Sequence, residues 1–420
     1  MRCHRLIVIG CGLALIGAAS VVGVAARESR GTPAARSAFA RGEAAADAGK
    51  LDQAVEAFRK AIAADPDYVA AHERLIDIAQ RQQLQDAQSA ILPRLKREYE
   101  QWARQHPTRA AYQVALGLLT KDPDEADACY NKALAIDPSS ASAHFLLARN
   151  AETRGDWEIQ RQHLKAAVAN DPDDPRYLLR YAVAHLKSDP DRFRELALQV
   201  VAAFPASPSA AEALYNLADA ASTSDRRSYL DRLRASYSVA RFRYSASAMN
   251  ILYADLTEPS DALALAREMA AALPAAAFWR QRVAAQDAMT RAKALIGSRQ
   301  FDEALALLEN TPPQPGNHGT TMTLLKAEAA AGGGNRQRAY ATLVESAAAS
   351  PDARVDAALA KFAAALGKTS RDVDADVWSI RDARATPAAP FALTSLRDGA
   401  PVQLADFRGR IVLLAFWYPT

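Results

Sequence analysis

Side chains that could carry out chemistry are few in this sequence, and they do not cluster. The seven histidines are scattered, with no His-Glu-x-x-His pair and no cysteine–histidine group of the kind that binds zinc. His144, His163 and His185 fall in segments with helical periodicity, where packed or surface histidines are expected. We therefore expect no metal site.

Two short stretches contain ligand-type residues but lack the rest of a motif. Asp372, Asp374 and Asp376 alternate as calcium ligands do, yet the glycine and the distal glutamate of a calcium loop are missing, so we expect a solvated linker. The glycine-rich residues 332–335 follow no strand and precede no Gly-Lys-Ser/Thr. They predict a turn between two helices rather than a phosphate loop.

The cysteines exclude a disulfide-built scaffold. Cys3 and Cys11 lie near the N-terminus, and Cys129 stands alone in the body of the chain, where it is expected to be half-buried in a helix. The sequence thus predicts no catalytic residue, no cofactor-binding residue and no metal ligand. A formal net charge of +3 gives no electrostatic footprint for nucleic acid.

The first 26 residues predict export. Arg2 and Arg5 precede 21 uncharged residues, Leu6 to Ala26, and the small residues 24–26 suit cleavage by signal peptidase. Residues 1–26 are therefore a signal peptide or, if uncut, a membrane anchor. A lipoprotein is a third alternative, because residues 8–11 resemble a lipobox, although the apolar stretch before Cys11 is short. We expect a periplasmic protein, either free or anchored in the inner membrane, with residues 27–35 as a linker.

The body of the chain is alanine-rich and repetitive, which predicts stacked pairs of helices. Segments 42–66, 126–138 and 141–172 each end in Asp-Pro, and the step from Pro138 to Pro172 is 34 residues. Small residues allow paired helices to approach closely, and large ones fill the gaps between pairs. Glycines mark the turns, where a left-handed backbone is needed. The small positions are Gly42, Ala54, Ala61, Ala133, Ala148 and Ala167, the large ones Phe58, Tyr130 and Leu164, and the turn glycines Gly49 and Gly155.

These positions resemble the tetratricopeptide family, with Gln160 as a departure from an expected alanine. The resemblance is strong over 36–205 and weaker over 206–367, where further amphipathic helices follow. It implies an all-α, right-handed solenoid of eight or nine helix hairpins. Such solenoids expose a groove that binds a protein or peptide. The basic and asparagine residues with which the family clamps a C-terminal carboxylate have no match here: Phe39, Glu43, Phe145 and Arg149 occupy those places.

The composition changes towards the C-terminus. Residues 368–389 gather Asp, Arg, Thr and Pro and are expected to be an interdomain linker. Residues 391–393 and 402–404 read as short strands around the turn signal Asp398-Gly399. The apolar run 411–417 has the length of a buried central strand.

Residues 390–420 resemble the opening of a redoxin domain of the thioredoxin-like superfamily, in particular of exported TlpA-type thiol–disulfide oxidoreductases. In that family a Cys-x-x-Cys follows directly, and here the chain reaches Thr420 where those cysteines are expected. A peroxide-reducing redoxin with Thr-x-x-Cys is a near variant. The matched positions are Pro390, Phe391, Gly399, Leu404, Asp406, Gly409, Arg410, Phe416 and Trp417.

Two functions remain open at this point. The resemblance implies that the intact product is an exported thiol–disulfide oxidoreductase whose tetratricopeptide region positions a protein partner. The alternative is a non-enzymatic periplasmic scaffold. In either case the chain as it stands, an all-α solenoid followed by a linker and an incomplete α/β thioredoxin-like fragment, holds no catalytic cysteine pair.

Overall fold

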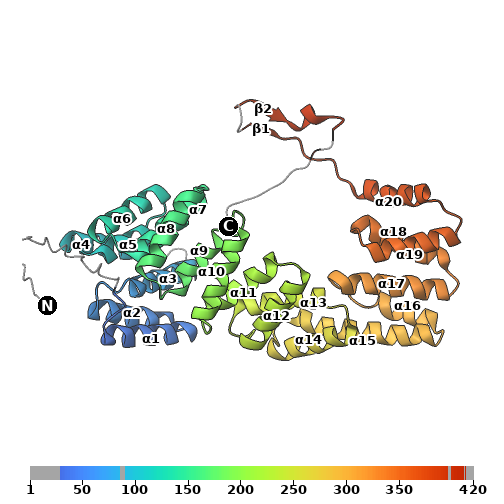
Figure 1. Cartoon of the computed structure of the whole chain (residues 1–420), viewed down its shortest axis with the longest axis horizontal. Coiled ribbons are helices and arrows are strands. Elements are labelled where there is room, and N and C mark those ends of the chain that lie inside the picture. Colours follow the sequence, from blue (N-terminus) through green and yellow to red (C-terminus); the bar gives the residue numbers. More distant parts are fainter. Residues whose placement is uncertain (1–28, 86–89, 396–398, 411, 413–420) are drawn as a thin grey trace, which may run out of the picture. The chain divides into compact units, whose positions relative to one another are not determined.

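The computed structural model describes residues 29–85, 90–395, 399–410 and 412. The predicted signal peptide or anchor, residues 1–26, lies outside this part of the chain. The described residues form two compact units, divided between Tyr177 and Leu178. Figure 1 shows that both are built from helices, and none of the helices described is both long and apolar enough to cross a bilayer.

Nine helices lie wholly or partly in the first unit, the ninth containing the division. They are α1 (Pro33–Asp47), α2 (Leu51–Ala64), α3 (Val69–Gln85), α4 (Ile91–Gln105), α5 (Ala110–Leu118), α6 (Pro123–Ile136), α7 (Ala141–Arg154), α8 (Trp157–Asn170) and α9 (Pro175–Val183).

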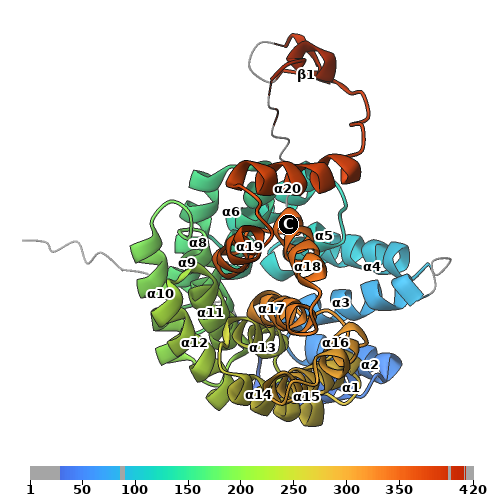
Figure 2. The ribbon, with the colours of Figure 1, turned by 90° about the vertical axis from the view of Figure 1, so that its right-hand side faces the viewer.

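The second unit continues in the same way. Its helices are α10 (Pro190–Ala203), α11 (Pro208–Ala220), α12 (Thr223–Ser236), α13 (Arg243–Asp255), α14 (Pro259–Ala272), α15 (Ala277–Gly297), α16 (Phe301–Glu309), α17 (Gly316–Gly332), α18 (Arg336–Ala349), α19 (Ala353–Ala365) and α20 (Ser370–Arg384). From α15 to α19 each helix packs against the next, and α20 packs mainly against α18 (Figures 1 and 2).

Small and large side chains interlock in the core as the repeat pattern predicts. All the predicted small alanines are buried, and so are Phe58, Tyr130 and Leu164. A Cβ placed on Gly42 would come within 2.5 Å of the Phe58 ring, and one on Gly117 within 2.2 Å of the Tyr130 ring. The absence of a side chain at each glycine therefore leaves the space that the aromatic ring of the paired helix fills.

The turns between paired helices share one backbone motif. Gly49 and Gly155 have φ of +72° and +78°, which confirms their predicted role. At Gly49 and the residue after it, two N–H groups donate to the carbonyls of Ala46 and Ala45, which satisfies the last turn of α1. Gly334 shows the same arrangement, so residues 332–335 are the predicted helix-to-helix turn.

The expectation of an irregular linker over 368–389 is wrong, because Ser370–Arg384 is helical. Thr369 caps α20, with its hydroxyl accepting from the Asp372 N–H while the Asp372 carboxylate accepts from the Thr369 N–H. Val373, Val377 and Ile380 form a narrow apolar stripe that packs on the core of α15 to α19. Because this apolar stripe is narrow and the rest of the segment is charged, the sequence shows little helical periodicity there.

The predicted linker over 27–35 is also too long, since α1 begins at Pro33. The Thr32 hydroxyl accepts from the Ala35 N–H at 3.2 Å and caps the helix, and proline at the first helical position costs no hydrogen bond. The folded body therefore starts three residues earlier than expected.

The C-terminal segment forms a small hairpin. Strands β1 (Ala392–Thr394) and β2 (Pro401–Gln403) pair antiparallel with Leu393 opposite Val402, and a short 3-10 helix, Leu404–Phe407, follows. Gly399 has φ of +71°, as a tight turn requires. This two-stranded sheet does not by itself define a thioredoxin-like fold. Most of the predicted strand 411–417 lies outside the described residues.

Candidate functional site

The positions that could have formed a carboxylate clamp in the first unit are used for packing. The Phe39 ring lies 5.4 Å from the Phe58 ring and 5.3 Å from the Tyr68 ring, measured between centroids. Glu43 accepts a hydrogen bond of 2.6 Å from Arg74 of α3. These two side chains therefore join neighbouring helices to one another.

The corresponding residues of α7 differ from each other. Phe145 packs against Tyr177 with a centroid distance of 5.1 Å, so it too is structural. Arg149 is exposed on the surface of the helix. An isolated exposed arginine has no geometry that selects a ligand.

Two of the histidines meet, but the described residues bring no third donor to them. His144 and His163 face each other with their Nδ1 atoms 3.0 Å apart, so one ring donates and the other accepts. Burial lowers the pKa of both rings, and the pair is therefore neutral at physiological pH. Within the described ranges, no three side chains of the metal-binding types come together. Cys129 is half-buried, as expected, and its thiol is free.

The aspartates of residues 372–376 also serve the fold. Asp372 completes the cap of α20, and Asp376 accepts from the Tyr340 hydroxyl and from Lys368, each at 2.7 Å. They lie on a helix, where Asp374 is turned to a different face from Asp372 and Asp376, so the three do not converge as in a calcium loop.

A different cluster, which sequence reasoning missed, lies on α13 and α15. Arg282 is half-buried, and the carbon of its guanidinium lies 4.2 Å from the ring centroid of Trp279, 4.5 Å from that of Tyr253 and 5.0 Å from that of Phe278. Its Nη1 donates to Asn250 Oδ1 at 2.8 Å. Phe278 is 42% exposed. We call these five residues the Arg282 cluster.

The second layer of this cluster is a set of buried polar groups. Gln286 Nε2 donates to the Tyr253 hydroxyl at 2.9 Å, and the buried His318 bonds the Tyr253 carbonyl oxygen through Nε2 at 2.7 Å. The bond from Gln286 and the His318 ring, whose centroid lies 4.4 Å from that of Tyr253, hold the Tyr253 ring between α13, α15 and α17. The ring is therefore a fixed surface under the Arg282 guanidinium.

The same helices hold polar atoms that the described chain leaves unpaired. Ser245 Oγ, Trp279 Nε1 and Gln286 Oε1 are buried without a hydrogen-bond partner. Such groups are rare in folded proteins, and they are usually satisfied by ordered water or by a ligand. The polar groups of this layer are thus incompletely satisfied by the protein itself.

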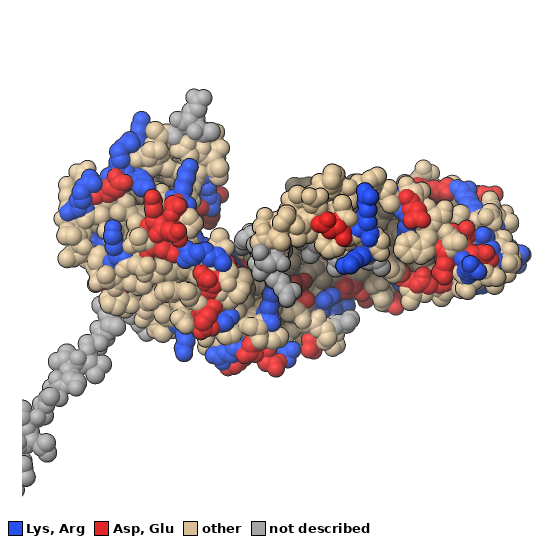
Figure 3. Space-filling model, turned by 90° about the horizontal axis from the view of Figure 1, so that it is seen from above, with Lys and Arg blue, Asp and Glu red and all other residues tan. Residues whose placement is uncertain are grey.

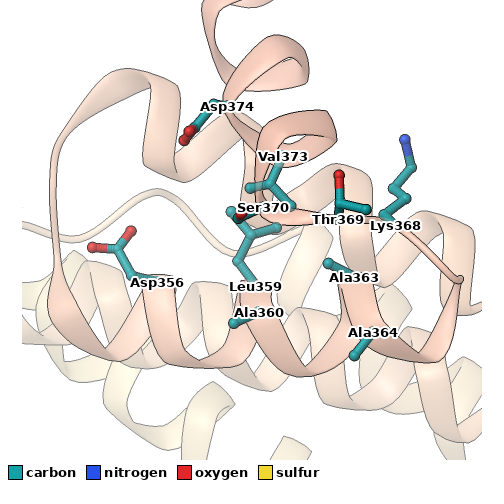
Figure 4. Close-up of a pocket in the computed structure, with 10 residues that line it drawn as sticks. All are labelled: Asp356, Leu359, Ala360, Ala363, Ala364, Lys368, Thr369, Ser370, Val373 and Asp374. Carbon is teal, nitrogen blue, oxygen red and sulfur yellow. The ribbon is translucent and has the colours of Figure 1, made fainter.

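A cavity lies farther along the chain, between α19 and α20. It has a volume of about 290 Å3, and Figure 4 shows that its floor is formed by Leu359, Ala360, Ala363 and Ala364 of α19. Val373 of α20 covers one side, with Asp356 and Asp374 at the edge. Lys368, Thr369 and Ser370 also line the cavity, so half of its ten lining residues are polar or charged. Two of these groups already serve the fold, since Thr369 caps α20 and Lys368 pairs with Asp376.

The charges of the surface are mixed. Figure 3 shows acidic and basic side chains interspersed over the face that it presents, rather than gathered into a patch of one sign. Many form ion pairs, such as Arg59 with Glu98 at 2.6 Å. Because exposed pairs are screened, they provide solubility more than recognition.

With the fold and cluster in view, the class of protein is clear: this chain contains tetratricopeptide repeats. Models of the tetratricopeptide repeat match residues 35–68, 120–175 and 147–208. They cover the segments where the repeat pattern is strongest and leave the helices from α11 onwards unmatched. The predicted tetratricopeptide repeats are therefore confirmed over these residues, and the Arg282 cluster lies on later helices that the models do not match.

Several solved structures have low identity to this chain, and two of them are described as tetratricopeptide proteins. A thermophilic one from Thermus thermophilus shares 15% identity, covers 48% of this chain and 99% of its own, and has a TM-score of 0.33. The type IV pilus biogenesis factor PilW shares 17% identity over 49% of this chain and 94% of its own, with a TM-score of 0.35. YrrB, described as having an unusual peptide-binding site, shares 14% identity over 42% and 89%, with a TM-score of 0.27. No curated protein matches the chain.

Proposed function

We propose that this chain binds a protein or peptide segment and that the Arg282 cluster is part of the contact surface. The observation that carries the proposal is the exposed Phe278 ring beside the half-buried Arg282, on helices that follow the matched tetratricopeptide repeats in the chain. Aromatic and arginine side chains provide most of the energy at interface hot spots. Stacked helix pairs present such residues along an extended surface.

Cross-linking from a chosen position tests the proposal. The full chain is panned against a library of random peptides, and a photoreactive phenylalanine analogue replaces Phe278 in the variant used for cross-linking. We expect enriched peptides that attach at position 278. The matched control places the same analogue at Trp157, which is 56% exposed on α8. Failure to enrich any peptide, or attachment at position 157 only, would contradict the proposal.

We also propose that the intact protein belongs to the thioredoxin-like oxidoreductases and that the repeats position its partner. Support comes from the resemblance of residues 390–420 to a redoxin opening and from the hairpin formed by β1 and β2 at the expected place. The deciding observation is the gene sequence after Thr420. A Cys-x-x-Cys there supports the proposal, and a lone cysteine three residues later favours a peroxide-reducing redoxin. If neither motif follows, the non-enzymatic periplasmic scaffold is the function that stands.

Export is a further part of this proposal, and it rests on the apolar leader, residues 6–26, which lies outside the described residues. Disulfide chemistry belongs in an oxidising compartment such as the periplasm. Fractionation of cells that express the full gene with an epitope tag tests it, and a tag found in the cytoplasm alone would contradict it.

A further inference from the structure

The Arg282 guanidinium has no carboxylate partner among the described residues. Most cations that reach the core of a protein are paired with an acid, because an unpaired buried charge is costly. The nearby acids on α13 and α15 are engaged elsewhere: Asp255 pairs with Arg226 at 3.8 Å, and Asp287 with Arg267 at 3.4 Å. Arg282 is therefore a charge whose counterion the described chain does not supply.

The surroundings of Arg282 fix its orientation without neutralising it. Three aromatic rings lie against the guanidinium, and Asn250 accepts only one of its five N–H donors. Burial lowers the pKa of Arg282, which shows that its surroundings disfavour the charge rather than compensate it. The side chain is thus held in place with donors still available.

The charged groups on the neighbouring helices α17 and α19 do not neutralise Arg282. His318 of α17 is buried, and burial together with the charges of Arg282 and Arg354 lowers the pKa of its ring. Arg354 of α19 donates to Asn317 at 3.2 Å and pairs with Asp352 at 3.2 Å. Because Asp352 balances the charge of Arg354 and the pKa of His318 is lowered, Arg282 is the cation of this group that has no acidic partner among the described residues.

We infer that Arg282 binds a carboxylate of an acidic peptide segment, with Asn250 orienting the guanidinium and Phe278 covering the contact. This inference rests on the proposed function and names the chemistry of the bound segment. A planar guanidinium can donate two parallel hydrogen bonds to a carboxylate, which is stronger and more selective than a contact with a single charge. The three aromatic rings restrict the motion of the Arg282 guanidinium, so little side-chain entropy is lost on binding.

Peptide selection with matched variants tests the inference. We expect the full chain to enrich library peptides that carry Asp, Glu or a free C-terminus, and Arg282→Gln to weaken their binding by about tenfold or more, because hydrogen bonds to charged groups are strong. Arg291→Gln, which removes the same charge from an exposed site on the same helix, should leave binding unchanged. Amidated copies of each peptide distinguish a terminal carboxylate from a side-chain one.

A second variant separates binding from folding. Arg282→Lys keeps the charge but loses the planar fork, and it should weaken binding while circular dichroism and the unfolding midpoint stay close to those of the parent. If the library yields neutral or basic peptides whose affinity Arg282→Gln does not change, this inference is overturned although peptide binding stands. If no peptide is enriched at all, the proposed function fails as well.

Discussion

At the scale of single residues, the fold depends on close contacts that leave no room for an added atom. Gly42 of α1 faces the fully buried Phe58 ring of α2, and the ring cannot move away without leaving its own packing. Interiors are packed at the density of organic crystals, so one extra methyl group is not absorbed there.

The first prediction follows from this contact. Gly42→Ala should lower the free energy of unfolding of the first unit by about 1–3 kcal/mol, because the new methyl group overlaps the ring. Gly297→Ala is the control, since Gly297 is helical, exposed and has nothing within 4 Å of its added Cβ. Helix propensity predicts that this control gains up to about 1 kcal/mol. Urea unfolding measures both, and equal effects would refute the packing argument.

The second prediction concerns pH. His72 is fully buried, with Nδ1 2.7 Å from the Tyr99 hydroxyl and Nε2 2.9 Å from the Pro66 carbonyl oxygen. Burial lowers the pKa of His72 from 6.5 to about 4. The unfolded chain therefore binds the proton more readily, so the stability due to this group is complete above pH 6.5 and is lost as the pH falls towards 4.

The size of that loss can be measured. The interval between the two pKa values is worth roughly 3 kcal/mol, since one pKa unit corresponds to about 1.4 kcal/mol. Unfolding of the first unit is followed by urea titration at pH 7 and at pH 4.5. In His72→Gln the drop between the two pH values should be smaller than in the parent. An unchanged pH dependence would show that His72 is not the titrating group.

At the scale of elements, the turn between paired helices is the most constrained feature. Gly49, Gly155, Gly334 and Gly367 all have positive φ, and the residue in the same place between α15 and α16 is Arg299, with φ of 61°. The Arg299 N–H donates to Ile296 and the next N–H to Leu295, as at the glycine turns. Tertiary packing of α15 against α16 therefore imposes this backbone on a residue that disfavours it.

The third prediction is that Arg299→Gly stabilises the second unit. A left-handed backbone costs a non-glycine residue about 1–2 kcal/mol, and glycine loses about 0.5–1 kcal/mol more backbone entropy on folding, so the net gain is up to about 1 kcal/mol. Arg299→Ala is the control: it removes the same exposed side chain but retains the Cβ, and it should give no gain. A thermal unfolding midpoint that rises equally in both variants would assign the effect to the lost charge.

For the molecule as a whole, the apolar face of the last helix pair in a stack of repeats has to be covered. Helix α20 covers α18 with its apolar stripe, and Arg381 donates to the carbonyl oxygens of Ala347 and Ala348, which lie at the C-terminus of α18. The opposite face of α20 carries charged residues and Trp378, which is 57% exposed. Terminal repeats with a polar outer face keep such arrays soluble.

The fourth prediction tests this capping role. Val377→Asp should cost about 2 kcal/mol, because it places a charge against the core of α15 to α19. Amide hydrogen exchange should accelerate in α18 and α20, since each repeat is stabilised by its neighbours, and remain unchanged in α1 and α2. Trp378→Asp introduces the same group on the exposed face and should have little effect. Comparable losses from both substitutions would show that α20 is not a cap.

The class of the fold could be predicted from the sequence alone, because small side chains, large side chains and turn glycines recur at one repeat length. Gly42, Phe58 and Gly49 could be assigned from spacing alone, since their roles depend on contacts within one helix pair. The hairpin formed by β1 and β2 was likewise indicated by a local turn signal. Turns and contacts within one helix pair or hairpin depend on residues that are close together in the sequence.

Contacts between residues far apart in the chain could be recognised only in the folded protein. The stripe of Val373, Val377 and Ile380 becomes recognisable only against the face of α18 that it covers. Likewise, Arg282 looks like any helical arginine until the aromatic rings and Asn250, 32 residues away, are placed around it. The physical reason is that the cost of a charge depends on everything that surrounds it, and side chains from several helices contribute to those surroundings.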